Sequence, residues 1–296
     1  MKRRTFIQQS SMASLALLGR MPKEKLKLSF STLGCPEWSF DQIVKFAVQH
    51  GYSGLEIRGI QKEMDLSKAA PFKSPEALKE TLRLMRDNKL VFVNLGASAA
   101  MHHAAPATRA KNLDEAKRLT DLAEQLSCPY IRVFPDHFPK DQDREKTIEL
   151  MVSGLKELGD YANNTSVTVL METHGDLVYA DDIVNVMQLA NHKKVALVYD
   201  MVNMWRITRE APGVVYPKLK SWIRHAHIKD LNIVEGNKPS YVLLGKGEAP
   251  VKETIELLKK GGYKGFYSFE WEKLWHPEIA DPEIAIADYV RVMKTL

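Results

Sequence analysis

The chain has 296 residues and a formal net charge of +5, with 45% hydrophobic and 27% charged residues. That length fits one large domain such as an α/β barrel of about 250 residues, and the composition is typical of a globular protein. The first 20 positions contain no acidic residue and four basic ones, Lys2, Arg3, Arg4 and Arg20. The remaining residues comprise 38 basic and 37 acidic ones, so their net charge is close to zero. This balance argues against a nucleic-acid-binding surface, which normally needs a clustered basic excess.

The first 25 residues have the layout of an export signal. The basic start MKRR is followed by a weakly polar stretch and the short apolar run MASLALLG. Arg3 and Arg4, followed by TFI, resemble the twin-arginine motif of the bacterial route that exports folded proteins. We therefore expect a signal segment at 1–25 and a periplasmic protein. An N-terminal tail on a cytoplasmic protein is the alternative, since no A-x-A cleavage site is evident.

From residue 26 onward, strand-like and helix-like segments alternate. Short apolar and β-branched runs predict eight strands, at 26–32, 54–59, 90–96, 130–134, 167–173, 195–201, 223–230 and 266–272. Apolar residues at helical spacing predict helices at 39–50, 74–88, 108–126, 143–162, 181–191, 250–260 and 283–294, while prolines interrupt the stretch after the sixth strand.

This alternation predicts an α/β fold, a (β/α)8 TIM barrel forming a single domain over residues 26–296. Eight strands joined by helices imply an all-parallel sheet, and eight is the number that closes. An open doubly wound sheet is the main competitor, but a dinucleotide-binding enzyme would show G-x-G-x-x-G after the first strand, where this chain reads STLGCPEWS. No apolar run approaches 18 residues, so we expect no stable membrane span.

Four successive strand-like segments end in a polar side chain of a metal-binding type. Glu172 ends VTVLME, Asp200 ends VALVYD, His227 lies in IRHAHIKD, and Glu270 lies in GFYSFEWE. Such strand ends share one face of a TIM barrel, where the active site lies. Oxygen and nitrogen ligands of this kind suit one divalent metal ion, namely manganese, magnesium, cobalt or zinc.

Other polar residues beside these positions are candidates for binding a substrate. Side chains alternate along a strand, so Lys229 shares the face of His227, and His174 shares that of Glu172. Each has a plainer interpretation: Lys229 and Asp230 as an ion pair at a strand end, and His174 as part of a loop. Trp38 is expected either in the core or as a wall against which a sugar ring packs.

Together these residues resemble the sugar phosphate isomerase/epimerase superfamily. This is the xylose isomerase-like TIM barrel group, also called AP endonuclease family 2, which includes inosose dehydratases, tagatose and psicose 3-epimerases and endonuclease IV. The resemblance covers about residues 26–296, and its motifs are STLGCPEWSFDQIVKFAVQHGYSGLEIR, METHGD, YDMVNMW, HAHIKD with GKGE downstream, and YSFEWE. It implies that Glu172, Asp200, His227 and Glu270 are the metal ligands.

The chain departs from the ketose 3-epimerases in the residues that hold their substrate. Asn203 stands where they carry a substrate-binding His, so the resemblance makes Asn203 a candidate for binding substrate. Val178 stands where they carry a second Glu, and residues 231–237 contain no Arg. Endonuclease IV needs three zinc ions held by further His and Asp residues, several of which are missing here. The resemblance therefore implies a metal-dependent enzyme with a small carbohydrate substrate, without specifying free-ketose 3-epimerisation.

We expect isomerase or epimerase chemistry through the enolate of a keto-sugar or related polyol derivative. In this family two Glu ligands approach the substrate from opposite sides, so either Glu172 or Glu270 removes a proton and the other returns one. If a leaving group lies β to the carbonyl, the same enolate expels it, which makes a 3-keto-glycoside lyase or dehydratase the alternative. A non-catalytic carbohydrate-binding barrel is a second alternative. Metal identity, exact substrate and oligomeric state stay open.

Overall fold

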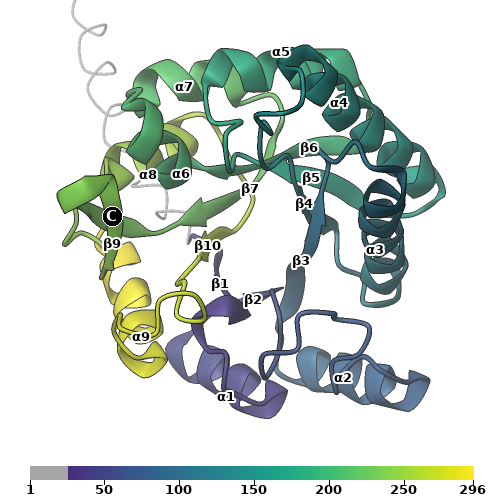
Figure 1. The fold of residues 1–296 in the computed structure, drawn as a ribbon. Helices are drawn as coiled ribbons and strands as arrows, with labels where there is room; N and C mark the ends of the chain where they lie inside the picture. Colours follow the sequence, from purple (N-terminus) through teal and green to yellow (C-terminus); the bar gives the residue numbers. More distant parts are fainter. Residues whose placement is uncertain (1–25) are drawn as a thin grey trace, which may run out of the picture.

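Residues 26–296 are described by a computed structural model, and they form a closed barrel of eight parallel strands (Figure 1). The barrel closes where Leu28 of the first strand pairs with Tyr267 of the last. The structure confirms the predicted TIM barrel, whereas the signal predicted at 1–25 lies outside the described residues. The barrel strands are β1 (Leu28–Ser31), β2 (Gly54–Ile57), β3 (Val91–Ala100), β4 (Tyr130–Phe134), β5 (Thr168–Glu172), β6 (Val195–Asp200), β7 (Ile223–Ile228) and β10 (Tyr267–Phe269).

The helices surround the barrel, and their local sequences explain where they begin. Ser39 and Gln42 form a reciprocal capping box at the first helix, and Ser74 with Pro75 starts the second. The seven helices expected from periodicity are all present. The α-helices are α1 (Phe40–His50), α2 (Pro75–Asp87), α3 (Pro106–Gln125), α4 (Arg144–Tyr161), α5 (Ala180–Ala190), α6 (Met201–Thr208), α7 (Pro212–Leu219), α8 (Val251–Lys260) and α9 (Pro282–Met293), and the 3-10 turns are η1 (Thr32–Gly34), η2 (Ala162–Asn164) and η3 (Glu235–Asn237).

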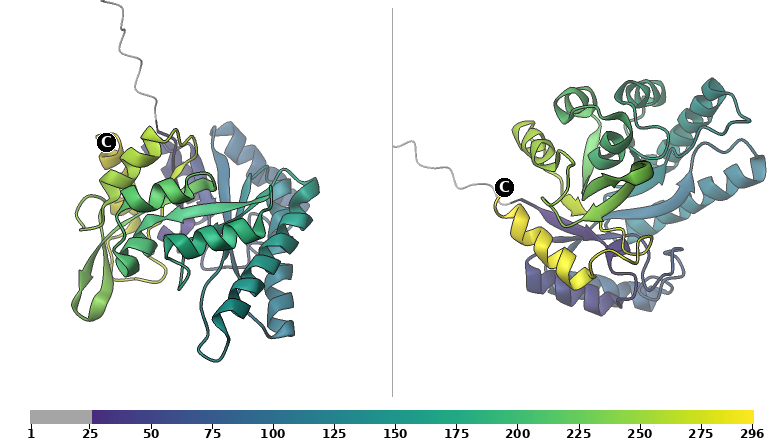
Figure 2. Two further views of the ribbon diagram at one scale, coloured as in Figure 1. Left: turned by 90° about the horizontal axis from the view of Figure 1, so that it is seen from above. Right: turned by 60° about the vertical axis from the view of Figure 1, so that its left-hand side comes forward.

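The structure differs from the expected elements in two places. The stretch after β6 contains α6 and α7, and Pro212 is tolerated because it is the first residue of α7, where no intrahelical donor is needed. An unpredicted antiparallel hairpin, β8 (Asp230–Val234) with β9 (Lys238–Val242), follows β7 and projects from the barrel (Figure 2). The last barrel strand is also short, so Glu270 directly follows it.

A small apolar cluster lies inside the barrel on the side of β5 and β6. Leu170 and Val198 form this cluster with Ala196, and Tyr130 packs against it. Because alternate residues share a face, Glu172 and Asp200 lie two residues further along the same face of their strands. The neighbouring strands place the polar side chains of Arg132 and His225 in register with Leu170 and Val198, so the polar cluster extends down that side of the interior.

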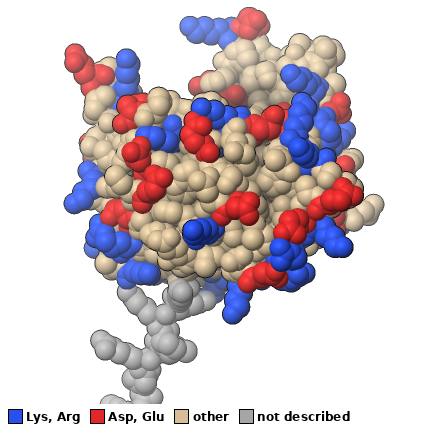
Figure 3. Space-filling model, turned by 90° about the horizontal axis from the view of Figure 1, so that it is seen from below, with Lys and Arg blue, Asp and Glu red and all other residues tan. Residues whose placement is uncertain are grey.

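The outer surface shows no feature that contradicts the near-neutral body. On the face seen in Figure 3, Lys and Arg side chains are interspersed with Asp and Glu. Within residues 26–296, no helix combines the length and the apolar character that crossing a membrane requires.

Candidate metal centre

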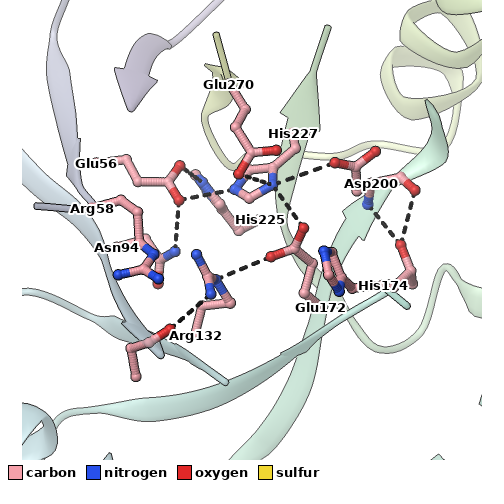
Figure 4. Close-up of polar contacts among 12 residues, drawn as sticks. Glu56, Arg58, Asn94, Arg132, Glu172, His174, Asp200, His225, His227 and Glu270 are labelled. Carbon is pink, nitrogen blue, oxygen red and sulfur yellow. Dashed lines mark hydrogen bonds and ion pairs between the residues drawn. The ribbon is translucent and has the colours of Figure 1, made fainter. Parts of the chain in front are cut away.

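The four predicted ligands meet at one end of the barrel (Figure 4). Glu172 and Asp200 are the last residues of β5 and β6, His227 lies near the end of β7, and Glu270 follows β10. All four are buried, and one ligand atom from each lies within 4.8 Å of the others. Parallel strands that end together bring these side chains to one place, as expected from the fold.

The His227 ring is held by a different partner at each nitrogen. Its Nδ1 lies 3.5 Å from Glu172 Oε1, 3.7 Å from Asp200 Oδ2 and 3.3 Å from Glu270 Oε1. Its Nε2 lies 2.9 Å from Glu56 Oε1, which can only accept a hydrogen bond when ionised. Nε2 therefore donates to Glu56. Burial lowers the pKa of His227, but Glu270, Glu56 and Glu172 raise it well above its usual range, so without a metal the ring carries a proton on Nδ1 as well. A bound metal would take the place of that Nδ1 proton.

Glu56 is a functional residue that the sequence analysis missed. Its buried carboxylate accepts hydrogen bonds from His225 Nε2 at 2.8 Å, Ser268 Oγ at 2.6 Å and Asn94 Nδ2 at 3.0 Å, besides the bond from His227. Burial raises the pKa of this carboxyl, but His227 and His225 outweigh burial and hold it well below its usual range. A single charged residue inside the otherwise apolar strand GLEI is the signal that could have identified it.

Lys229 is a fully buried cation beside the four ligands. Its Nζ lies 2.8 Å from Asp200 Oδ2, 2.7 Å from Glu270 Oε2 and 2.7 Å from Glu272 Oε1. Burial lowers the pKa of Lys229, but the three carboxylates, Asp200 first, raise it well above its usual range. Burial likewise raises the pKa of Glu270, while His227 and Lys229 hold it well below its usual range. Lys229 is therefore a charged partner that keeps Glu270 ionised.

The cluster fits a divalent cation. His227 Nδ1, Glu172 Oε2 and Asp200 Oδ2 are buried without a hydrogen-bond partner of acceptable geometry, although Arg132 and Lys229 approach the two oxygens as ion-pair partners. Buried polar atoms normally have hydrogen-bond partners, and a bound cation would satisfy these three atoms together. Three carboxylates and one imidazole are ligands for manganese, magnesium, cobalt or zinc. The identity of the metal remains a prediction.

Asn203 and His174, both predicted to bind substrate, lie near this cluster. Asn203 donates from Nδ2 to Glu172 Oε1 at 3.3 Å and from its backbone N to Asp200 Oδ1 at 2.9 Å. His174 packs against the Phe134 ring and approaches Asp136 Oδ1 at 3.4 Å. Burial lowers the pKa of His174, but Asp136 and Glu172 raise it. Both side chains therefore lie beside the acids, and their substrate roles stay predictions.

Asp230 and Trp38 are occupied elsewhere. The carboxylate of Asp230 accepts from the backbone N of Leu231 at 2.9 Å and of Gly245 and Gly247 at 2.8 and 3.0 Å. Asp230 thus anchors the segment that follows the β8–β9 hairpin. The Trp38 ring packs 4.8 Å from that of Phe46 on α1. These contacts give both side chains a structural role, and their predicted substrate roles gain no support.

Arg132 is a second residue that the sequence analysis missed. It lies in the middle of β4, is 1% exposed, and places Nε 3.0 Å from Glu172 Oε2. Its Nη1 donates to the carbonyl of Ala97 at 2.8 Å, and its guanidinium lies 3.8 Å from the Phe134 ring centre. Arg132 therefore fixes the Glu172 carboxylate from the side opposite His227.

Comparison with known proteins identifies the family. The family described as xylose isomerase-like TIM barrel matches residues 44–296. A 3-dehydroshikimate dehydratase of Bacillus anthracis is 21% identical, over 79% of this chain and 85% of its own. A fructoselysine 3-epimerase of Escherichia coli O157:H7 is 22% identical, over 83% and 90%. Among solved structures, a 3-keto-D-glucoside 4-epimerase from E. coli has a TM-score of 0.72 at 15% identity and covers 92% of this chain and 100% of its own.

Proposed function

Because the chain belongs to the xylose isomerase-like TIM barrel family, we propose that it is a metal-dependent isomerase or epimerase of a keto-sugar or related polyol derivative. The observation that carries this proposal is the set of four buried ligand side chains whose atoms lie within 4.8 Å of one another at the strand ends. The relatives whose names include epimerases and dehydratases support enzymatic chemistry on small substrates.

The two glutamates are the groups that move protons. Figure 4 draws Glu270 and Glu172 on opposite sides of the His227 ring. One, as a carboxylate, removes the proton from the carbon next to the substrate carbonyl. The other, which must first take up a proton from solvent, gives that proton to the opposite face and so inverts the carbon. Exchange with solvent then returns both glutamates to their starting protonation states. A bound divalent metal supplies Lewis-acid stabilisation of the negative charge that develops on the substrate oxygen. Lys229 pairs with Glu270 and keeps it ionised, which is the form that can accept a proton, although the same pairing lowers its strength as a base.

A lyase or dehydratase is the second candidate, and one observation favours it. The relatives include a 3-dehydroshikimate dehydratase and an inosose dehydratase, the latter 28% identical over 47% of this chain. Removal of the same proton is followed by loss of a group β to the carbonyl, with the second glutamate protonating the leaving group. For an exported protein, a 3-keto-glycoside is a natural substrate of this kind.

The experiment that tests the proposal follows proton exchange. The protein loaded with manganese, magnesium, cobalt or zinc is incubated in D2O with a panel of ketoses and 3-keto-glycosides, and the products are followed by NMR. Deuterium beside the carbonyl together with a new stereoisomer supports epimerisation, whereas an unsaturated product supports elimination. Sugar binding without any exchange would replace both with a non-catalytic carbohydrate-binding barrel.

A further inference from the structure

Two buried arginines share one space beside the acidic cluster. Arg58, which follows β2, is 6% exposed, and Arg132 on β4 is 1% exposed. Both lie against the bare backbone of Gly96, where a methyl group would come within 2.6 Å of Arg58 Cδ and 2.9 Å of Arg132 Nη2. Figure 4 shows the two guanidinium groups on the same side of the cluster, next to Asn94. A glycine on β3 thus makes room for two like charges.

The two arginines differ in their partners. Arg132 is paired with Glu172 and bonded to the carbonyl of Ala97. Arg58 has no ion pair with any residue in 26–296; its Nη2 donates to Ser98 Oγ at 3.0 Å, and its Nη1 is buried without a hydrogen-bond partner. The nearby carboxylate of Glu115 accepts from the backbone N of Ser98 at 2.6 Å. Arg58 is therefore a buried cation with a donor still unused.

A buried guanidinium without an anionic partner is costly, and an incoming anion removes the cost. Burial and the neighbouring Arg132 lower the pKa of Arg58 to about 9. The guanidinium fork matches the two oxygens of a carboxylate. The carboxylates of Glu115, Glu172 and Glu270 are near enough to raise the pKa of Arg58, and they would repel a doubly charged phosphate more than a singly charged carboxylate. The unused Nη1 donor of Arg58 therefore favours a small group with a single negative charge.

We propose that Arg58, supported by the charge of Arg132, binds a carboxylate of the substrate. This inference rests on the proposed function, and it narrows the substrate class to keto acids derived from sugars or polyols. Arg132 shares the space at Gly96 with Arg58 and is paired with Glu172. A substrate carboxylate bound to Arg58 would therefore lie one side chain away from Glu172, which moves the proton. Arg58 is a binding residue that selects acidic over neutral substrates.

The test uses ligands that lack a carbonyl and therefore cannot react. Calorimetric titration of the metal-loaded protein compares D-gluconate with its neutral counterpart D-glucitol and with D-glucitol 6-phosphate. The wild type is expected to bind D-gluconate roughly tenfold more tightly than D-glucitol, as a charge-assisted hydrogen bond provides. Arg58→Gln should bring the two affinities together, and Arg58→Lys should keep a reduced preference because it retains the charge and loses the fork.

Arg86→Gln is the matched control, because Arg86 is an exposed arginine on α2 whose recorded ion pair is with Asp87. Its preference for D-gluconate should equal that of the wild type. Equal wild-type affinities for D-gluconate and D-glucitol, or an unchanged preference in Arg58→Gln, would overturn the carboxylate site. Tighter binding of the phosphate would overturn the choice of a carboxylate. The titrations need no turnover, so they test the carboxylate site separately from the proposed function. If no substrate exchanged a proton in D2O, that result would contradict the proposed function and leave the carboxylate site standing.

Discussion

At the scale of single residues, the hydrogen bond from His227 Nε2 to Glu56 fixes the orientation of the His227 ring. Glu56→Gln keeps the size of the side chain but replaces one acceptor oxygen with a donor, so it cannot satisfy His225 and His227 in their present orientation. We expect the metal affinity to fall about 10–100-fold, as is usual when the partner of a ligating histidine is lost. Competition with a chelator measures this affinity.

Glu149→Gln serves as the control for Glu56→Gln, because Glu149 is an exposed residue of α4 paired with Lys146. It should leave the metal affinity unchanged. The NMR signals of the His227 ring should shift in Glu56→Gln and not in the control. Wild-type metal affinity in Glu56→Gln would show that the hydrogen bond to Nε2 does not position the ring.

Glu270 serves as both ligand and proton carrier in the proposed function. Glu270→Gln should retain the fold but lose most metal binding and turnover, because an amide is a poor ligand and no base.

Asn203→Ala should change substrate affinity more than metal content, since the Asn203 side chain contacts Glu172 through one hydrogen bond of 3.3 Å. Elemental analysis gives the metal content, and proton exchange in D2O gives the turnover. Unchanged exchange in Glu270→Gln would remove Glu270 from the catalytic pair.

The sequence predicted the ligands better than the residues that hold them. Glu172, Asp200, His227 and Glu270 stand at strand ends, where fold geometry alone brings them together. Glu56 and Arg132 lie within strands, where the sequence can mark a charged residue as unusual but does not say which side chains it meets. Their role depends on which residues of β2, β4 and β7 lie level with one another, and pairing register is a tertiary property.

At the scale of elements, the loop between β5 and α5 depends on one glycine. Gly175 has φ +64°, and a methyl group there would overlap the carbonyl of Asp136, which also accepts from the backbone N of Asp176 at 2.8 Å. Gly175→Ala should therefore add a clash to the strain of a left-handed residue, and we expect it to destabilise the protein by about 2–4 kcal/mol in chemical denaturation.

Gly236→Ala in the β8–β9 hairpin separates these two effects. Gly236 has φ +75°, but no atom lies within 4 Å of the position of an added methyl group. It should cost about 1 kcal/mol, from backbone strain alone. If Gly175→Ala lowered the free energy of unfolding no more than Gly236→Ala does, the close approach of Asp136 would not contribute to the cost of the substitution.

Sequence patterns predicted those elements that are amphipathic or wholly apolar. The missed hairpin reads DLNIVEGNKPSYV, where polar residues obscure the alternation and a proline is the second residue of the return strand. It is held in part by Asp230, whose bonds to Gly245 and Gly247 connect residues distant in sequence. Helix α7 was missed because Pro212, Gly213 and Pro217 suggest a break, although a proline at the first position starts a helix. Helix α6 is short and begins directly at the end of β6, so no loop separates the two in the sequence.

At the scale of the whole molecule, a metal held by four elements should stabilise the entire barrel. β5, β6, β7 and the segment after β10 each supply a ligand, so unfolding would release the ion. At 100 times its dissociation constant, a ligand specific to the native state adds about 2.7 kcal/mol. For a protein of this size we expect addition of the metal to the chelator-treated protein to raise the Tm by roughly 5–10 °C.

Differential scanning calorimetry measures this shift, with Glu270→Gln as the variant that should lose most of it. Calcium serves as a comparison, because it prefers six to eight oxygen ligands and suits this set with its histidine poorly. If none of manganese, magnesium, cobalt or zinc raised the Tm of the wild type, the cluster would not be a metal centre.

The distribution of charge along the chain carries the remaining proposal, which is that the protein is exported folded. The basic residues before Met21 have no acidic partner, and three of them precede an apolar run, a layout that an export signal requires and a barrel does not. An enzyme that acquires its metal in the cytoplasm has a reason to cross the membrane folded, by the twin-arginine route. Arg3→Lys with Arg4→Lys should therefore leave the activity of the purified protein unchanged but retain it in the cytoplasm of its host. Fractionation measures the distribution, and a wild-type protein found wholly in the cytoplasm with residues 1–20 still attached would contradict export.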